Sequence, residues 1–344
     1  MPHADTLLFL HGIGDGDPDD KWLSVLERSL TRLGYPGVTG VNVIAPKYPN
    51  GLKGVDETKP LPKTSVRTLH GDAADTNRRN YERRRTAMEV LLGSDDPGEG
   101  VPLGDAVISL AAYFGPFSAA ENYVKKPEVR SWVLHWILGK LPSSGRLLIV
   151  GHSLGSVIAA DLVRRLPVEL EVAGLVTIGS PLAHKNFDFA DLRDGLRNPP
   201  PNLGWWVNFW TKGDPVPGHR GISPVLPWVL DHRIKTSTGP NPVTAHLAQT
   251  YMANDRVARA IGFGVFGSQS KALVLANKGV DIRLDYAETS ALLALRLARL
   301  TLNQLEGDTR DRYEQAVRTV QADTVARIAQ RNTHENRPLP SAIS

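Results

Sequence analysis

One serine of this chain lies in a sequence context that can make it a nucleophile. Residues 146–150 are mostly apolar and predict a buried parallel strand, and a helix of small residues follows and ends at Leu166, before Pro167. Between them, Gly151-His152-Ser153-Leu154-Gly155 forms a G-x-S-x-G motif. The turn from strand to helix is crowded, so the positions two before and two after the serine must lack side chains. The pattern predicts Ser153 at the tip of this turn, with its Oγ above the edge of a sheet.

A serine in this position can carry out acyl transfer. The helix that follows directs its amino terminus, with unpaired N–H groups, toward the group that Ser153 attacks. The N–H of Leu154 can donate to the oxyanion that develops during the reaction. Strand, motif and helix occur together once in the chain, and this combination is more specific than the motif alone. The alternative interpretation is a tight turn with an inert serine.

This segment resembles the nucleophile elbow of the α/β-hydrolase superfamily, in its lipase and serine-esterase branch. That family orders its catalytic residues along the chain as serine, acid and histidine. A predicted strand at 173–179, followed by Ser180-Pro181-Leu182, is similar to the strand after the elbow in lipase-like relatives, including the lecithin–cholesterol acyltransferase and inositol-deacylase groups. The resemblance covers segments of 6–46 and 144–260. It implies an α/β fold of the α/β-hydrolase type with a mainly parallel central sheet.

The resemblance implies that Asp214 is the acid and His246 the base. Asp214 lies in Gly-Asp-Pro-Val-Pro after a predicted strand, and a carboxylate there can orient an imidazole and stabilise its charged form. Alternatively, Asp214 only forms the turn before proline. His246 opens a helix after the last predicted strand, where the family keeps its general base. His219, close to Asp214 in the loop, and His232, within the strand predicted at 230–236, are competing candidates.

The resemblance also implies a second donor to the oxyanion. Residues 6–10 predict a strand, and His11-Gly12-Ile13-Gly14 follows it directly. In resembling hydrolases the residue after His-Gly supplies an oxyanion N–H, which is that of Ile13 here, while His11 braces the loop. A strand followed by glycines also begins phosphate-binding loops, but G-x-G-x-x-G and Gly-Lys-Ser/Thr are both missing here.

We expect neither a metal nor a cofactor. Asp15, Asp17 and Asp19 alternate as in a calcium loop, but that pattern needs glycine at its sixth position and glutamate at its twelfth, and neither is present. We interpret these acids as capping the next helix, which carries Trp22 and Leu26 on its inner face. The chain has no cysteine, which excludes disulfides, thiolate catalysis and cysteine-bound metals.

The bulk composition is that of a globular protein. The 344 residues are 41% hydrophobic and 22% charged, and they suffice for a large core. The net charge of +4 comes from interspersed charges, so we expect no nucleic-acid partner. No apolar run of membrane-spanning length occurs, and the first strand begins at Thr6, which leaves no room for a signal peptide. These observations predict a cytoplasmic protein.

The sequence divides into four expected parts. Residues 1–267 form the hydrolase domain, and an insertion at about 47–130 is expected to form a cap, with a loop at 47–62 and helices at 76–92, 106–113 and 128–138. Apolar residues then recur at intervals of three and four along 284–305 and 313–328, which predicts a helical hairpin within 268–330. The polar residues 331–344 are expected to be disordered.

Part of the insertion is strongly basic. Residues 63–85 contain seven lysines and arginines and three acids. The simpler interpretation is a solvated helix face. The alternative is a cationic rim that attracts an anionic substrate or makes peripheral contact with an anionic lipid surface.

These observations predict a serine hydrolase of carboxylic esters, with an ester or lipid-like small molecule as substrate. An amidase, a peptidase or an acyltransferase would use the same three residues. A third hypothesis is an interaction module, in which the hairpin binds a protein partner or a second copy of the chain. The residues that bind the substrate cannot be assigned from the sequence.

Overall fold

The computed structural model describes most of the chain. The described residues are 4–13, 19–55, 59–93, 95–99, 118–190, 192–236, 241–267, 291, 294–295, 297–298 and 301–334. Among the described residues, the strands are β1 (Thr6–Leu10), β2 (Asn42–Ile44), β3 (Gly145–His152), β4 (Leu170–Ile178), β5 (Trp206–Trp210) and β6 (Leu230–Arg233). The helices are α1 (Lys21–Arg32), α2 (Pro49–Lys53), α3 (Gly71–Leu92), α5 (Ser118–Lys125), α6 (Pro127–Leu138), α7 (Leu154–Leu162), α8 (Leu192–Gly195), α9 (Pro242–His246), α10 (Ala248–Met252), α11 (Asp255–Phe266) and α14 (Gly307–His334), with short 3-10 turns at Val38–Gly40, Lys185–Phe187 and Thr301–Gln304.

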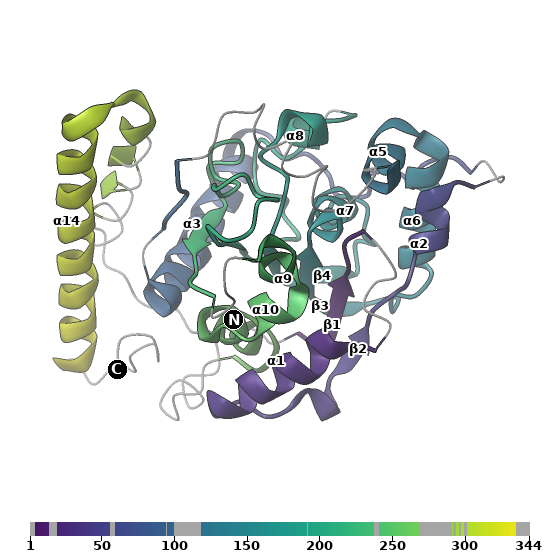
Figure 1. Ribbon diagram of the computed structural model, residues 1–344, viewed down its shortest axis with the longest axis horizontal. Coiled ribbons are helices and arrows are strands. Elements are labelled where there is room, and N and C mark those ends of the chain that lie inside the picture. Colours follow the sequence, from purple (N-terminus) through teal and green to yellow (C-terminus); the bar gives the residue numbers. More distant parts are fainter. Residues whose placement is uncertain are drawn as a thin grey trace.

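The six described strands form one parallel sheet in the order β2-β1-β3-β4-β5-β6, and Figure 1 labels the first four of them in chain order, β1 to β4. Strands β1, β4 and β5 and residues 147–151 of β3 are almost wholly buried, which explains why their sequences are nearly continuous apolar runs. β1 pairs with β3 along its whole length, from Thr6 opposite Leu147 to Leu10 opposite Gly151. The structure is therefore α/β with a parallel sheet, as the sequence predicts, and the ends of β1 and β3 lie side by side.

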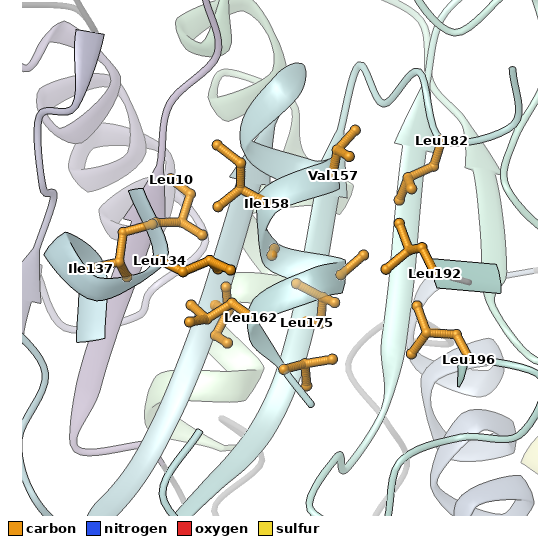
Figure 2. Close-up of a cluster of buried hydrophobic side chains, with 14 of the residues drawn as sticks. Leu10, Leu134, Ile137, Val157, Ile158, Leu162, Leu175, Leu182, Leu192 and Leu196 are labelled. Atoms are coloured by element: carbon orange, nitrogen blue, oxygen red, sulfur yellow. The ribbon is translucent and has the colours of Figure 1, made fainter. Parts of the chain in front are cut away.

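Helices cover both faces of this sheet. Alternate residues of β1 point to opposite faces, so that Leu8 and Leu10 join one hydrophobic cluster and Leu7 and Phe9 join the other. The first cluster holds α7, flanked by α6 on one side and by the α8 segment on the other (Figure 2). The second cluster contains α1, α10 and α11. Helix α7 is buried along its full length, which fixes its amino end against the sheet.

Helix α1 buries the face that the sequence predicts, but the residue at its amino-terminal cap is Asp20, which is not one of the three acids expected there. Trp22, Leu26 and Leu30 are buried. Asp20 precedes the helix with a left-handed backbone, and its side chain makes no capping hydrogen bond. The Asp20 carboxylate instead pairs with Lys47 in the segment after β2 at 2.8 Å, and that of Asp19 pairs with Lys21 at 3.1 Å. Asp15 and Asp17 lie outside the described residues.

The insertion between β2 and β3 contains more helix than the sequence predicts. Part of the expected loop at 47–62 is α2, whose first residue is proline, as is common at helix amino ends. Helix α3 begins five residues before the predicted 76–92. It packs beside β5, where the Trp206 N–H donates to the Tyr81 hydroxyl at 3.0 Å. The helix predicted at 106–113 lies outside the described residues, so a cap over Ser153 stays a prediction.

The carboxyl-terminal part is described mainly by α14, at one edge of the molecule (Figure 1). The second stripe of the predicted hairpin falls within α14, which continues four residues into the tail that was expected to be disordered. Most of the first predicted helix lies outside the described residues. An ion pair of 2.7 Å between Arg310 and Glu99 links α14 to the insertion. Within the described ranges, every helix is too short or too polar to cross a bilayer.

Candidate active site

The turn that carries Ser153 has the crowded geometry that the motif predicts. Ser153 has φ 52° and ψ −126°, a conformation that costs a non-glycine residue about 1–3 kcal/mol. A Cβ on Gly155 would lie 2.0 Å from the Leu10 carbonyl oxygen, and one on Gly151 would lie 2.7 Å from the Ser156 Cα. Both positions therefore need glycine, because backbone from β1 and α7 occupies the space of a side chain. The Ser153 N–H donates to the Ile178 carbonyl at 3.1 Å, which ties the turn to β4.

The structure brings Ser153, His246 and Asp214 into one chain of hydrogen bonds. The Ser153 Oγ lies 2.9 Å from the His246 Nε2. On the other side of the ring, the His246 Nδ1 lies 2.8 Å from the Asp214 Oδ2. The three residues are 93 and 32 positions apart in these two pairs, and all three are buried. A carboxylate accepts only, so Nδ1 carries the proton and Nε2 can accept the proton of the serine hydroxyl.

The surroundings of Asp214 keep it ionised. Burial on its own raises the pKa of this carboxyl. The charge of a protonated His246 and the hydrogen bonds to the carboxylate outweigh burial and hold the pKa of Asp214 below its usual value. Two of those bonds come from the Tyr251 hydroxyl at 2.6 Å and from the Val216 N–H at 2.9 Å. An ionised Asp214 can fix the tautomer of the imidazole and stabilise the imidazolium.

The topology of the sheet explains why the loop after β1 meets Ser153. The chain leaves β1 toward β2 on one side and returns to β3 on the other side, so the carboxyl ends of β1 and β3 border a switch point, where α/β proteins commonly bind ligands. A Cβ on Gly12 would lie 2.7 Å from the Ser153 Cβ. Gly12 therefore packs against the serine, and Ile13 is the next residue. The Leu154 N–H is in the first turn of α7, where N–H groups have no intrahelical acceptor.

His11 braces this loop, as the resemblance implies. Its Nδ1 lies 2.8 Å from the Gly12 carbonyl oxygen, and its ring stacks on Tyr48 at 4.0 Å between centroids. The Tyr48 hydroxyl donates to the His11 carbonyl at 2.6 Å. Burial lowers the pKa of His11 to about 4, so the ring is neutral near pH 7. These contacts bind the loop beside Ser153 to the start of the insertion.

His152 holds the backbone of His246 through a hydrogen bond. Its Nε2 donates to the His246 main-chain carbonyl at 2.6 Å, and the two rings lie 4.8 Å apart between centroids. Burial is the main reason that the pKa of His152 falls to about 3, and nearby His246 lowers it further. A neutral imidazole with its proton on Nε2 can donate this bond throughout the physiological range. His152 therefore anchors the backbone that carries the candidate base.

The two competing histidines lie elsewhere. His219 is in the loop between β5 and β6 with a left-handed φ of 57°. His232 is in β6 itself, fully buried and stacked on Phe209 at 5.7 Å between centroids. Of the three candidates, it is His246 to which the structure gives hydrogen bonds with both Ser153 and Asp214.

Sequence reasoning missed two residues of this site. The Tyr251 hydroxyl donates to Asp214. The sequence could have suggested this residue only through its place in α10, the short helix that follows His246. Gly179 has φ 56°, and a Cβ there would lie 2.8 Å from the Asp214 Oδ2 and 3.2 Å from the His246 ring. It was read as the end of a strand, whereas its missing side chain is what allows acid and base to meet beside β4.

Comparisons with known proteins add little to this picture. No family model and no curated protein matches the chain. Among solved structures, it is similar to an uncharacterized protein from Pseudomonas aeruginosa with a TM-score of 0.31 and 12% sequence identity. The match covers 96% of this chain and 62% of that chain, so the chain spans less than two thirds of the length of that protein.

Proposed function

We propose that this protein is a serine hydrolase that cleaves carboxylic esters, with Ser153 as nucleophile, His246 as general base and Asp214 as the acid that orients it. One observation carries the proposal, namely the continuous hydrogen-bonded chain from the Ser153 Oγ through His246 to Asp214, with distances of 2.9 and 2.8 Å. In a serine hydrolase, a hydroxyl paired with an imidazole that is itself paired with a buried carboxylate is an activated nucleophile.

The proposed reaction has two halves. The Ser153 Oγ attacks the ester carbonyl carbon while the His246 Nε2 takes the hydroxyl proton, and a tetrahedral intermediate forms. The intermediate collapses, the bond to the alcohol oxygen breaks, and His246 gives its proton to the departing alcohol. Water then attacks the acyl-enzyme, His246 removes a proton from the water, and the acid leaves as the Ser153 hydroxyl is restored.

The N–H groups of Ile13 and Leu154 are the proposed donors to the oxyanion. Ile13 follows the glycine that packs against the Ser153 side chain, and Leu154 begins the helix behind it. Donors fixed by backbone need no reorganisation when charge develops on the substrate oxygen, and each is typically worth roughly 10²–10³ in turnover.

The finer fold assignment is also part of the proposal. The sheet is parallel, and Ser153 lies at a strained turn after the central strand β3. Asp214 follows β5 and His246 follows β6, which is the chain order that α/β-hydrolases use. We assign the chain to that fold on this arrangement.

A covalent probe tests the proposal. A fluorophosphonate should label the wild-type protein at Ser153, and the Ser153→Ala variant should show no label. Ser24→Ala is the matched control, because Ser24 lies on α1 and its hydroxyl donates to the Lys21 carbonyl. Labelling that persists in Ser153→Ala, or that is missing from the folded wild type, would contradict the proposal.

The choice of ester over amide needs a second measurement. The same residues serve amidases, peptidases and acyltransferases, because each reaction passes through an acyl-enzyme. We expect turnover of a chain-length series of p-nitrophenyl esters and little cleavage of peptide substrates. A preference for peptides would keep the nucleophile and overturn the ester assignment.

A further inference from the structure

A cavity lies at the opposite end of helix α7 from Ser153. It has a volume of about 420 Å³ and lies between the segment before α3, the first turns of α3, the α8 segment and Arg164. Arg164 comes just after α7, a helix that spans roughly 14 Å. The cavity therefore opens near the amino ends of β3 and β4, whereas the candidate active site lies at their carboxyl ends.

The lining of this cavity is strongly cationic. Four of its residues are arginines, and its single carboxylate is that of Asp194. Asp194 pairs with Arg197 at 2.9 Å, so the charges of Arg67 and Arg78 are in excess of the carboxylates in the lining. Arg67 and Arg78 belong to the basic segment 63–85, for which the sequence favours a solvated helix face over a cationic rim. The structure places them on a concave wall at the other end of α7 from Ser153, which differs from both interpretations.

Hydrogen bonds join two walls of the cavity. The Asn77 side chain donates to the Pro199 carbonyl at 2.9 Å, and Arg78 donates to the Asn198 side chain at 2.5 Å. Both bonds join α3 to the segment 198–201, and its three prolines have little backbone freedom. A guanidinium has five N–H donors, so the bond from Arg78 to Asn198 leaves further donors on the same group.

The Arg164 guanidinium occupies the space that a side chain at Gly195 would need. A Cβ at this position would lie 1.9 Å from the Arg164 Nη1 and 2.0 Å from its Cζ. The guanidinium therefore lies directly on the glycine, and any side chain at 195 would displace it. This contact gives a way to move a charge within the cavity without removing it.

We propose that this cavity binds an organic phosphate. Arginine presents paired N–H groups that match phosphate oxygens in geometry and charge. The first turn of α3 also borders the cavity, and the residue before that helix makes no side-chain cap, so its N–H groups add to the positive field. The volume is in the range of small-molecule sites. It leaves room for an organic group beside the phosphate.

Calorimetric titration with glycerol 3-phosphate tests the proposal on the full chain. We expect binding to the wild type and at least a tenfold loss of affinity in Arg67→Gln/Arg78→Gln, because two charged donors are removed. Arg83→Gln is the matched control, since Arg83 is an exposed arginine of α3 outside the cavity lining. It should bind as the wild type does.

Gly195→Ala separates a built site from diffuse attraction. This variant keeps every charge but displaces the Arg164 guanidinium, so a specific site should lose several-fold in affinity, whereas diffuse attraction would be unchanged. Co-sedimentation with phosphatidylcholine vesicles that contain phosphatidic acid identifies the source of the phosphate. Binding to vesicles without binding of glycerol 3-phosphate, again lost in Arg67→Gln/Arg78→Gln, would assign a lipid headgroup.

Three results would overturn the proposal. They are no binding of either probe, equal weakening by Arg83→Gln and Arg67→Gln/Arg78→Gln, and unchanged affinity in Gly195→Ala. Circular dichroism spectra and thermal melts of the same variants show that they are folded. The cavity does not depend on the proposed hydrolase activity, because a wild-type protein that the probe fails to label could still bind phosphate.

Discussion

Asp214 and Asp231 are both fully buried carboxylates at the same sheet, yet their surroundings differ. Asp214 accepts from an imidazole, a phenol and a backbone N–H, and its pKa lies below its usual value. Asp231 accepts from the Asn208 side chain and from the backbone N–H groups of Ile222 and Ser223. Burial raises the pKa of Asp231 above its usual value, although these hydrogen bonds act against burial.

Burial therefore does not distinguish the proposed catalytic carboxylate from Asp231, whereas their hydrogen-bond partners do. An imidazole that can become charged stabilises an ionised Asp214 and connects it to Ser153. The donors to Asp231 are neutral and connect it to the neighbouring strands. One of them, the Asn208 side chain, accepts in turn from the Thr177 hydroxyl on β4 at 2.8 Å. This second network crosses β4, β5 and β6 and holds the turn at 221–223 against the sheet.

The largest expected effect separates the two carboxylates by activity. In Asp214→Asn, the amide favours the wrong imidazole tautomer, and we expect kcat for ester hydrolysis to fall by roughly 10⁴. Asp231→Asn is the matched variant, with the same chemical change at equal burial, and its kcat should stay near that of the wild type. Steady-state hydrolysis of a p-nitrophenyl ester measures both. A small loss in Asp214→Asn would leave Asp214 as a turn-forming residue only.

The next effect concerns stability. Asp231→Ala leaves the Ile222 and Ser223 N–H groups and the Asn208 amide without their acceptor, and we expect a loss of about 3–5 kcal/mol in the free energy of unfolding. Urea denaturation measures this loss. Activity per active site, with the sites counted by fluorophosphonate titration, should be unchanged, since the folded fraction keeps the proposed triad. If that specific activity falls in step with stability, the two networks are not separate.

The contrast also shows what the sequence could predict. Strands β1, β3, β4 and β5 were predictable because each is a short apolar run between turn residues, and the elbow was predictable because its two glycines record the crowding around Ser153. Asp214 and His246 could be assigned because they lie at strand ends in the chain order of a known family. Each of these signals is local, or depends on order along the chain alone.

Contacts between distant segments could not be predicted. The network of Asp231 depends on the register that aligns Thr177 with Asn208 and Asn208 with Asp231, and no single segment carries that register. Tyr251 and Gly179 were missed for the same reason, since each acts on Asp214 from another element. The sequence shows the positive charge of residues 63–85. It does not show the cavity that part of this segment lines, because the other walls come from the α8 segment and from Arg164 after α7.

A third effect is the dependence of stability on pH, which has opposite signs for the two carboxylates. The folded pKa of Asp214 lies below the usual 3.8, so the stability that Asp214 contributes is present above that value and is lost as pH falls below it. The folded pKa of Asp231 lies above 3.8, so its contribution is present below 3.8 and is lost as pH rises through the folded pKa. Each pKa unit corresponds to about 1.4 kcal/mol.

Urea denaturation over a pH series measures these slopes. The difference in free energy of unfolding between wild type and Asp214→Asn should grow as pH rises toward 3.8. The difference between wild type and Asp231→Asn should shrink as pH rises above 3.8. Slopes of the same sign would mean that the imidazole does not distinguish the two carboxylates.

The smallest expected effect comes from weakening Asp214 without removing it. Tyr251→Phe keeps a buried ring but deletes the hydroxyl that donates to the same Asp214 oxygen as His246 does. The carboxylate then has one donor fewer, so its pKa should rise and the acid-side loss of stability should shift to higher pH. Because Tyr251 acts on the reaction through Asp214, we expect kcat to fall by about tenfold, which corresponds to roughly one hydrogen bond to a charged group.

Tyr35→Phe is the matched control for that change. Tyr35 is also buried, and among the described residues its hydroxyl has no hydrogen-bond partner, so the variant should alter neither kcat nor the acid-side slope. If Tyr251→Phe lowers stability but leaves kcat and the slope as they are in Tyr35→Phe, the Tyr251 hydroxyl only fills a polar site. The imidazole and the Val216 N–H would then keep Asp214 ionised. His246 would be the donor that distinguishes the surroundings of Asp214 from those of Asp231.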